Sequence, residues 1–561
     1  MTLGRSGTDH RSGGRVTIRP RPGHARVTAR PGRAAPGRPL PVRRNAPGQR
    51  TPRCADTRDV WKAGRMTPSR PAAHAAVVGG GIAGLTAARA LARAGVRVTV
   101  LEGSPRIGGK LQVSEVAGVP VDEGAESMLA RRPEGLGLVR DLGRGGDLVH
   151  PGTTSSAILS RGALRPIPSG QVMGVPSDLK ALAASQVLSP AGLARVPLDL
   201  VMPETPRGDD VSVADYIGAR MGREVVDRLV EPLLGGVYAG RAERLSFDST
   251  LPAVAAAARA HRSLINAVQG IREAAPADPG PVFATLPGGL GTLPPLVAAD
   301  IEAAGGTVRV NATVRELRRR PDGWRLTIGS ARAPEHLDAD AVVIAVPAAP
   351  ASRLLSDEVP AAGRALAGIE YASMAIVTLV YQASAFPKPP DGSGYLVPGV
   401  ESDTGAGGRG VKAVTFSSVK WPHLRDRDPG VVAVRCSIGR FGEEHLLQRP
   451  DEELKAVAMA ELAATTGVTE LPVDGRVTRW GGGLPQYNVG HADRVAGVRA
   501  AVAREPGLAV AGAAYDGLGI PACIASATAA ADRVLDHLRS RGGTNDVRHG
   551  AGGQAEGTRT Q

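Results

Sequence analysis

The stretch VVGGGIAGLTAARALARAGVRVTVLEGSPRIGGK runs from Val77 to Lys110 and alternates apolar segments with glycine turns. The apolar segment Ala75–Val78 at its start predicts a β-strand. LTAARALARAG consists of good helix formers and ends in a glycine that can cap a helix. VRVTVL predicts a second, buried parallel strand. The stretch therefore predicts a strand–helix–strand unit.

Three glycines between the first strand and the helix, Gly79, Gly81 and Gly84, have the G-x-G-x-x-G spacing. The first allows a tight turn, the second admits a pyrophosphate, and the third lets helix pack on strand. Glu102 closes the second strand 18 residues after Gly84, near the roughly 20 expected for an acid that binds ribose hydroxyls. A glycine triplet alone could be an ordinary turn. Its register with strand, helix and acid predicts a dinucleotide site, with the pyrophosphate at the helix N-terminus.

The residues after Glu102 favour FAD over NAD. GSPRIGGK brings a second glycine pair, for which an NAD-binding unit has no need. The pattern E-x-x-x-R-x-G-G-[KR] resembles the family of flavin-dependent amine oxidases, phytoene desaturases and porphyrinogen oxidases, in which the arginine and paired glycines close over FAD. The resemblance implies an FAD site formed here by Gly79, Gly80, Gly81, Ile82, Ala83, Gly84, Glu102, Gly103, Arg106, Gly109 and Lys110.

The charge of the chain is concentrated at its beginning. Of a formal net charge of +14, residues 1–65 contribute most, with 15 Arg and one Lys against three Asp. From Met66 onward 52 basic residues face 51 acidic ones, so the remainder is nearly neutral. Residues 1–65 are rich in Arg, Pro and Gly and have too few apolar residues to offset their ordering entropy. We predict disorder there and, for similar reasons, in residues 541–561.

Three interpretations of residues 1–65 compete. They could form a nucleic-acid-binding arm, an Arg-rich transit peptide, or an extension upstream of a true start at Met66. The third is favoured because Met66 stands just before the first predicted strand. In addition, 61 Arg against seven Lys indicates a GC-rich bacterial genome, where spurious upstream starts are common.

Several classes of protein are disfavoured by composition. The most apolar uncharged window, Ala72–Ala88, contains the glycine turn and is too short to span a bilayer, and no secretory signal precedes it. Cys54, Cys436 and Cys523 are scattered, and the 11 His form no H-E-x-x-H pair, so neither a disulfide framework nor a metal site is indicated. We expect a cytoplasmic protein with no metal, no integral membrane segment and no nucleic-acid partner.

Later segments return to the nucleotide-binding part. GGTVRVNATVREL and HLDADAVVIAVPAAPASRLL are strand patterns bounded by turns, and WRLTIGS supplies another strand between them. LAVAGAAYDGLGIPACIASATAAADRVLDHL predicts a strand, a glycine-rich turn and a helix with Pro521 in its first turn. The resemblance places Val314 at the adenine end of FAD. It places Gly512, Gly519, Ile520 and Pro521 at the flavin, where a helix N-terminus would stabilise negative charge on the reduced ring.

The resemblance implies an α/β fold of the flavin amine oxidase type, with a discontinuous Rossmann-like FAD-binding domain and an inserted α+β substrate domain. At 561 residues, the chain is long enough for at least two domains. We expect the FAD-binding domain over residues 66–150, 275–350 and 490–540. The substrate-binding domain is expected over residues 151–274 and 351–489.

Three stretches narrow the family: DEGAESMLARRPEGLGLVRDLG, EPLLGGVYAGRAERLSFDST and RWGGGLPQYNVGHADRV. Together they resemble the oxygen-dependent, FAD-containing porphyrinogen oxidases of heme biosynthesis, over about His74 to Leu538. The resemblance adds Gly124, Ala125, Glu126 and Ser127 to the FAD contacts. Arg131 and Arg132 are candidates for binding substrate carboxylates, since arginine suits bidentate carboxylate recognition, although a surface pair or structural ion pair is an equal alternative.

The resemblance implies oxidation of coproporphyrinogen III to coproporphyrin III, the reaction of the water-soluble bacterial branch. Hydride transfer to flavin N5 in three rounds would remove six electrons, with molecular oxygen as acceptor, hydrogen peroxide as by-product and possible product handover to a ferrochelatase. No acid–base side chain is identified, because the cofactor performs the chemistry. Tyr487 and His491 are expected to be structural. The alternatives are a protoporphyrinogen IX oxidase, an amine oxidase or carotenoid desaturase, and a non-catalytic FAD-binding protein.

Overall fold

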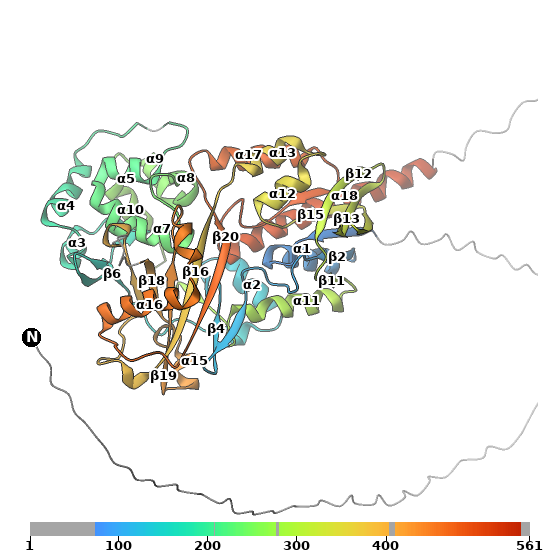
Figure 1. Ribbon diagram of the computed structural model, residues 1–561. Helices are drawn as coiled ribbons and strands as arrows, with labels where there is room; N and C mark the ends of the chain where they lie inside the picture. Colours follow the sequence, from blue (N-terminus) through green and yellow to red (C-terminus); the bar gives the residue numbers. More distant parts are fainter. Residues whose placement is uncertain (1–72, 207, 277–279, 403–409, 551–561) are drawn as a thin grey trace, which may run out of the picture. The chain divides into compact units, whose positions relative to one another are not determined.

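The computed structural model describes residues 73–206, 208–276, 280–402 and 410–550 (Figure 1). The predicted disorder of residues 1–65 lies outside the described residues. So does Cys54, whereas Cys436 and Cys523 are buried free thiols.

The predicted strand–helix–strand unit begins a five-stranded parallel sheet. β1 (His74–Val78) and β2 (Arg97–Leu101) are its first strands, and the helix between them is α1 (Ile82–Arg93). The sheet has the order β11-β2-β1-β15-β21 and is completed by β11 (Thr307–Arg309), β15 (Ala341–Ile344) and β21 (Leu508–Val510). Three distant parts of the chain therefore build one sheet, as a discontinuous nucleotide-binding fold requires.

Alternate residues of these strands enter two separate cores, because successive side chains point to opposite faces. Val77, Val100 and Val343 pack with one helical layer. That layer consists of α1, α2 (Pro133–Asp141), α11 (Leu293–Ala303) and α18 (Ile520–Gly550). Val342 and Ile344 face the opposite layer.

The opposite layer contains a three-stranded antiparallel sheet and three helices. Its members are β12 (Val314–Arg320), β13 (Gly323–Ser330), β14 (Ala333–Ala339), α12 (Ala348–Leu355), α13 (Pro360–Ala367) and α17 (His491–Ala503). WRLTIGS thus forms a strand as predicted, but in this small sheet and not in the parallel one. α13 and α17 lie side by side (Figure 1). The core of this layer extends past residue 350, the boundary expected from the sequence for the second part of the FAD-binding domain.

A second large sheet has seven strands in the order β20-β16-β19-β18-β17-β6-β7. Its strands are β6 (Ala157–Ser160), β7 (Ala163–Pro166), β16 (Tyr371–Gln382), β17 (Gly394–Leu396), β18 (Val411–Phe416), β19 (Val431–Ile438) and β20 (Asp474–Pro485). The helix α16 (Asp451–Thr466) packs on one face through Leu454, Ala458 and Leu462.

Residues 179–273 form a helical group with its own core. Its helices are α3 (Leu179–Ser185), α4 (Pro190–Arg195), α5 (Val213–Met221), α6 (Arg223–Val225), α7 (Glu231–Tyr238), α8 (Phe247–Thr250), α9 (Pro252–Ala260) and α10 (Leu264–Glu273). The stretch EPLLGGVY forms α7.

Several short elements complete the fold. They are the hairpin of β3 (Val113–Val116) and β4 (Val119–Asp122), the pair β5 (Met128–Leu129) and β10 (Phe283–Ala284), the pair β8 (Gln171–Val172) and β9 (Val175–Pro176), and the helices α14 (Ser417–Lys420) and α15 (Pro422–Arg427).

The end of α18 corrects one prediction. The helix continues to Gly550, so residues 541–550 are helical, although composition predicted disorder from residue 541. An established helix adds one hydrogen bond for each residue it orders, so a polar segment can extend it. Residues 551–561 lie outside the described part.

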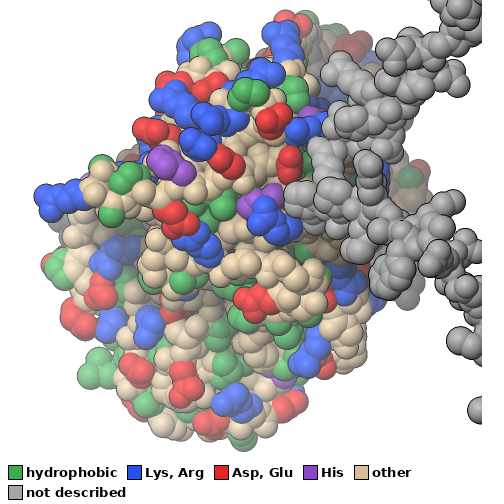
Figure 2. Space-filling view, turned by 90° about the vertical axis from the view of Figure 1, so that its right-hand side faces the viewer, with side chains coloured by type: hydrophobic (Ala, Val, Ile, Leu, Met, Phe, Trp, Pro, Cys, Tyr) green, Lys and Arg blue, Asp and Glu red, His purple; other side chains and the backbone are tan. Residues whose placement is uncertain are grey.

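The surface agrees with the near neutrality of the chain after Met66. On the face shown in Figure 2, basic and acidic side chains lie among one another. No helix within the described residues is long and apolar enough to cross a membrane.

Candidate functional site

The glycine turn after β1 has the geometry that the spacing predicts. Gly79 has φ +109°, and its N–H donates to the Leu101 carbonyl at 2.9 Å. A Cβ on Gly84 would lie 1.9 Å from the Gly79 carbonyl oxygen, so only glycine lets α1 approach the strand this closely. Gly84 is therefore a packing position.

Gly81, in contrast to the tightly packed Gly84, borders open space. Apart from its chain neighbours, no described heavy atom lies within 4 Å of a Cβ built on Gly81. Gly81 is also the N-cap of α1, and no side chain of a described residue caps the helix. Free N–H groups at a helix N-terminus that face open space suit a pyrophosphate. Ile82 and Ala83, predicted FAD contacts, form the first turn of this helix.

Glu102 lies beside the same turn. Its carboxylate accepts hydrogen bonds from the N–H of Gly80 at 2.6 Å and of Ser104 at 2.8 Å. Each carboxylate oxygen retains acceptor capacity, so Glu102 can still accept from ribose hydroxyls.

The segment before β12 joins this end of the site. The Ala312 N–H donates to the Glu102 carbonyl at 2.7 Å, and a Cβ on Gly103 would lie 3.0 Å from Thr313 Oγ1. Val314, two residues further on, is half-buried at the start of β12. The structure thus brings Val314 near Glu102 and Gly103 from more than two hundred residues away.

The second glycine pair closes against the first. The Gly108 N–H donates to the Gly80 carbonyl at 2.8 Å, and a Cβ on Gly109 would lie 3.4 Å from the Gly81 Cα. The Arg106 side chain extends toward Trp480 of β20, and its guanidinium carbon lies 6.0 Å from the centroid of the Trp480 ring.

Lys110 is a cation without a partner. Its ammonium group makes no hydrogen bond or ion pair with any described residue, and burial lowers its pKa. The electrostatic influence of Lys110 on Cys523 of α18 places the lysine near the beginning of that helix. An unpaired, partly buried cation fits a site for an anionic cofactor.

The glycine-rich turn before α18 also borders open space. Gly512 has φ +127°, and a Cβ built on it meets no described atom within 4 Å. Gly519 precedes the helix, and Ile520 and Pro521 begin it. The Pro521 ring lies 3.4 Å from a Cβ built on Gly135 of α2, so α2 and α18 meet where the flavin contacts are predicted.

Residues 124–127 connect the two sheets. A Cβ on Gly124 would lie 2.0 Å from the Lys110 carbonyl oxygen, so glycine is required at this close approach. Glu126 pairs with Lys420 and, at 2.6 Å, with Arg435. Burial opposes ionisation of Glu126, but the two cations lower its pKa to about 2. The Glu126 carboxylate therefore joins the segment after β4 to α14 and β19, and the predicted FAD contacts of residues 125–127 would have to come from the backbone.

Lys420 and Arg435 were not predicted as parts of the site. They follow Glu126 by 294 and 309 residues, and no local pattern signals such a pairing.

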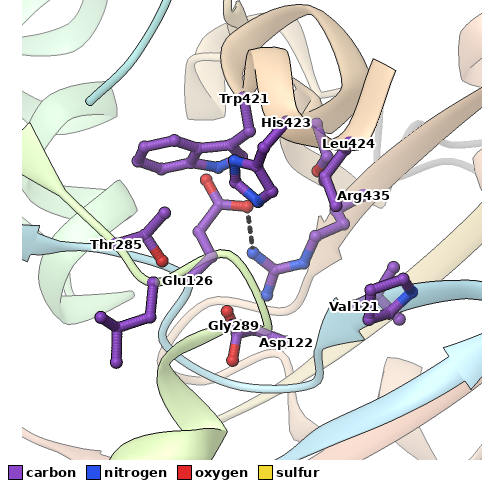
Figure 3. Close-up of a pocket in the computed structure, with 12 residues that line it drawn as sticks. Val121, Asp122, Glu126, Thr285, Gly289, Trp421, His423, Leu424 and Arg435 are labelled. Atoms are coloured by element: carbon purple, nitrogen blue, oxygen red, sulfur yellow. Dashed lines mark hydrogen bonds and ion pairs between the residues drawn. The ribbon is translucent and has the colours of Figure 1, made fainter. Parts of the chain in front are cut away.

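A cavity of about 20 Å³ lies beside this junction (Figure 3). Four buried polar atoms that line it have no hydrogen-bond partner among the described residues: Thr285 Oγ1, Ser417 Oγ, His423 Nδ1 and Arg435 Nε. Asp122 accepts from the N–H groups of Leu290 and Gly291, and burial raises its pKa to about 6. A polar cavity of this size has room for buried water but not for a cofactor. The cavity is therefore part of the junction and separate from the glycine turns.

Arg131 and Arg132 are exposed just before α2. Arg132 pairs with Glu134 at 2.5 Å. Arg131 makes no side-chain hydrogen bond or ion pair with the described residues. The three carboxylates of Asp227, Glu231 and Glu243 lie close together, but Arg223 and Arg241 pair with them, so we assign no metal to this group.

Comparison with known proteins identifies two family models that match this chain. The model of the family described as flavin containing amine oxidoreductase matches residues 82–535, from the first turn of α1 into α18. A model described as pyridine nucleotide-disulphide oxidoreductase matches residues 34–118.

Individual relatives match along nearly their whole length. A coproporphyrinogen III oxidase of Mycobacterium tuberculosis is 38% identical over 474 residues, covering 82% of this chain and 97% of the relative. A protoporphyrinogen oxidase of Bos taurus is 30% identical over 493 residues, covering 82% and 98%. A solved structure from Exiguobacterium, of a protein proposed to be a protoporphyrinogen oxidase, has a TM-score of 0.72 and 31% identity, covering 84% and 99%.

Proposed function

This chain belongs to the flavin containing amine oxidoreductases, and from that premise we propose that it is an FAD-dependent porphyrinogen oxidase. Its reaction is the oxidation of coproporphyrinogen III to coproporphyrin III in heme biosynthesis. Family membership confirms the predicted α/β fold and the FAD cofactor. The substrate is supported by the relatives named coproporphyrinogen III oxidase, such as that of M. tuberculosis.

The observation that carries the cofactor assignment is the open space at two glycine turns, around Gly81 and around Gly512. The α1 N-terminus at Gly81 holds the pyrophosphate, and Glu102 accepts from the ribose. Lys110 follows the second glycine pair, lies near the beginning of α18 and supplies positive charge. These residues fit FAD as a group, because Gly81 and Gly512 border open space, Glu102 retains acceptor capacity and the Lys110 ammonium pairs with no described residue.

The protein's part in the reaction is binding and orientation. Bound FAD supplies a two-electron acceptor that molecular oxygen can reoxidise, with hydrogen peroxide as product. The N-terminus of α18, with Gly519, Ile520 and Pro521, places a partial positive charge at the flavin. No side-chain acid or base is assigned to the reaction.

Substrate choice is proposed to depend on Arg131 and Arg132. Coproporphyrinogen III has four carboxylates and protoporphyrinogen IX has two, so a basic pair just after the predicted FAD contacts at residues 124–127 would favour the former. Arg131, whose side chain pairs with no described residue, can donate to a propionate, whereas Arg132 would have to share or leave Glu134. The protoporphyrinogen oxidase relative of Bos taurus supports protoporphyrinogen IX as the second candidate substrate.

The remaining assignments also belong to this proposal. Molecular oxygen is the electron acceptor, and a ferrochelatase can receive the product. The cytoplasm is the proposed compartment.

The decisive experiment compares the two porphyrinogens. Purified protein should be yellow, should consume oxygen with a porphyrinogen and not with an amine, and should have a higher kcat/KM for coproporphyrinogen III. A higher value for protoporphyrinogen IX would replace the proposed substrate, and turnover of an amine would refute the porphyrinogen assignment.

Variants of the basic pair test substrate recognition separately. A charge-assisted hydrogen bond contributes roughly 1.5–3 kcal/mol, so Arg131→Ala or Arg132→Ala should lower kcat/KM about 10- to 150-fold, mainly through KM. Arg140→Ala, at the other end of α2, is the matched control. An unchanged KM in both variants at full FAD content would mean that the pair is a surface feature.

A further inference from the structure

The motif LPQYNVGH, residues 484–491, lies between the helix α7 and the glycine-rich turn before α18. Gln486 is buried, and its side-chain amide donates to the Tyr238 carbonyl at the end of α7, at 2.8 Å. The Tyr487 ring lies 5.5 Å from the Tyr238 ring. One side of the motif is therefore attached to α7.

The hydroxyl of Tyr487 attaches the other side to the turn. It donates to the Ala513 carbonyl at 2.7 Å and accepts from the Gly517 N–H, also at 2.7 Å. These two groups stand at opposite ends of the segment 513–517. Burial raises the pKa of Tyr487, so the hydroxyl keeps its proton and both hydrogen bonds. A single oxygen thus closes the turn.

His491 supports Tyr487 and contacts the middle of the turn. Its ring stacks on the Tyr487 ring with centroids 3.9 Å apart, and its Nε2 lies 3.2 Å from the Tyr515 carbonyl. Burial lowers the pKa of His491, so the ring is neutral, and with its proton on Nε2 it donates to that carbonyl.

We infer that Gln486, Tyr487 and His491 act as a strut that holds the segment 512–519 at a set distance from α7. In the proposed function this segment borders the flavin, and α7 lies within residues 151–274, the expected substrate-binding domain, so the strut would position the two reactants relative to each other. The inference rests on the proposed function, since the proposal places the flavin at this turn. Tyr487 is thus a positioning residue, which acts through the segment 513–517.

Removing the Tyr487 hydroxyl tests the contribution of its two hydrogen bonds to the position of the segment 513–517. Tyr487→Phe keeps the ring and its stacking but leaves the Gly517 N–H and the Ala513 carbonyl without a partner. The matched control is Tyr395→Phe. Tyr395 is equally buried, and its hydroxyl bonds Thr465 within the core between the seven-stranded sheet and α16.

The test uses the FAD-loaded protein and three readouts. In Tyr487→Phe, amide hydrogen exchange of a peptide covering residues 512–519 should accelerate about tenfold, FAD content should stay the same, and the flavin midpoint potential should shift. With coproporphyrinogen III, kcat should fall about tenfold at unchanged KM, because misplacement affects the transition state. His491→Asn should give smaller changes in the same direction, and Tyr395→Phe should change none of these readouts.

Unchanged exchange in residues 512–519 of Tyr487→Phe would overturn the strut. Faster exchange with an unaltered flavin potential and kcat would show that the strut does not position the flavin. Equal effects of Tyr395→Phe on these readouts would show general destabilisation of the protein. Failure of the proposed function appears differently, as an absence of porphyrinogen turnover in the unmodified protein, while hydrogen exchange and the flavin potential remain measurable.

Discussion

Gly81→Val separates cofactor binding from folding. A Cβ at Gly81 meets no described atom within 4 Å, and the residue has φ −75°, which valine adopts readily. The folded apoprotein should therefore lose only the difference between glycine and valine as an N-cap, about 1 kcal/mol. The added methyl groups occupy the space assigned to the pyrophosphate. If two charge-assisted hydrogen bonds to it are lost, FAD binding weakens by roughly 3–6 kcal/mol, or about 10²- to 10⁴-fold in Kd.

The assay combines flavin absorbance of the purified protein, titration of apoprotein with FAD, and urea unfolding of both apoproteins. Gly84→Ala is the contrasting variant, because its Cβ would lie 1.9 Å from the Gly79 carbonyl oxygen. It should destabilise the apoprotein by about 1–3 kcal/mol or more. Stoichiometric FAD in purified Gly81→Val would refute the assignment of the nucleotide site to this turn. A loss of apoprotein stability as large as that of Gly84→Ala would refute the claim that the space beside Gly81 is open.

Three further variants test other parts of the protein. Glu102→Ala should weaken FAD binding less than Gly81→Val does, because it removes ribose hydrogen bonds without a steric block; equal losses measured by FAD titration would contradict this. Glu126→Gln leaves the buried cations Lys420 and Arg435 without a counter-charge and should lower the free energy of unfolding by about 3–5 kcal/mol. Because the pKa of Glu126 is about 2 in the folded protein against 4.5 ordinarily, this difference should be complete above pH 4.5 and shrink as pH falls toward 2, as urea unfolding at several pH values can show. Deleting residues 1–65 should leave Tm and turnover unchanged, and a large loss of either would mean that Met66 is not the functional start.

The nucleotide-binding turn could be predicted because its determinants are local. The spacing of Gly79, Gly81 and Gly84 and the acid at Glu102 are confined to one strand–helix–strand unit, whose backbone geometry follows from glycine and helix propensities. The structure reproduces both strands within one residue, whereas α1 begins at Ile82, three residues before the segment LTAARALARAG. Composition was a weaker guide, since it predicted disorder from residue 541 where α18 continues to Gly550.

The sequence by itself thus determined the βαβ unit, the type of cofactor and, through its longer motifs, the family. Only the tertiary structure decided how the distant segments meet. Pairing of Glu126 with Lys420 and Arg435, and closure of the turn 513–517 by Tyr487, join residues separated by 26 to 309 positions. Periodicity and propensity act over a few residues, whereas these contacts depend on how the two sheets pack, so no local pattern contains them.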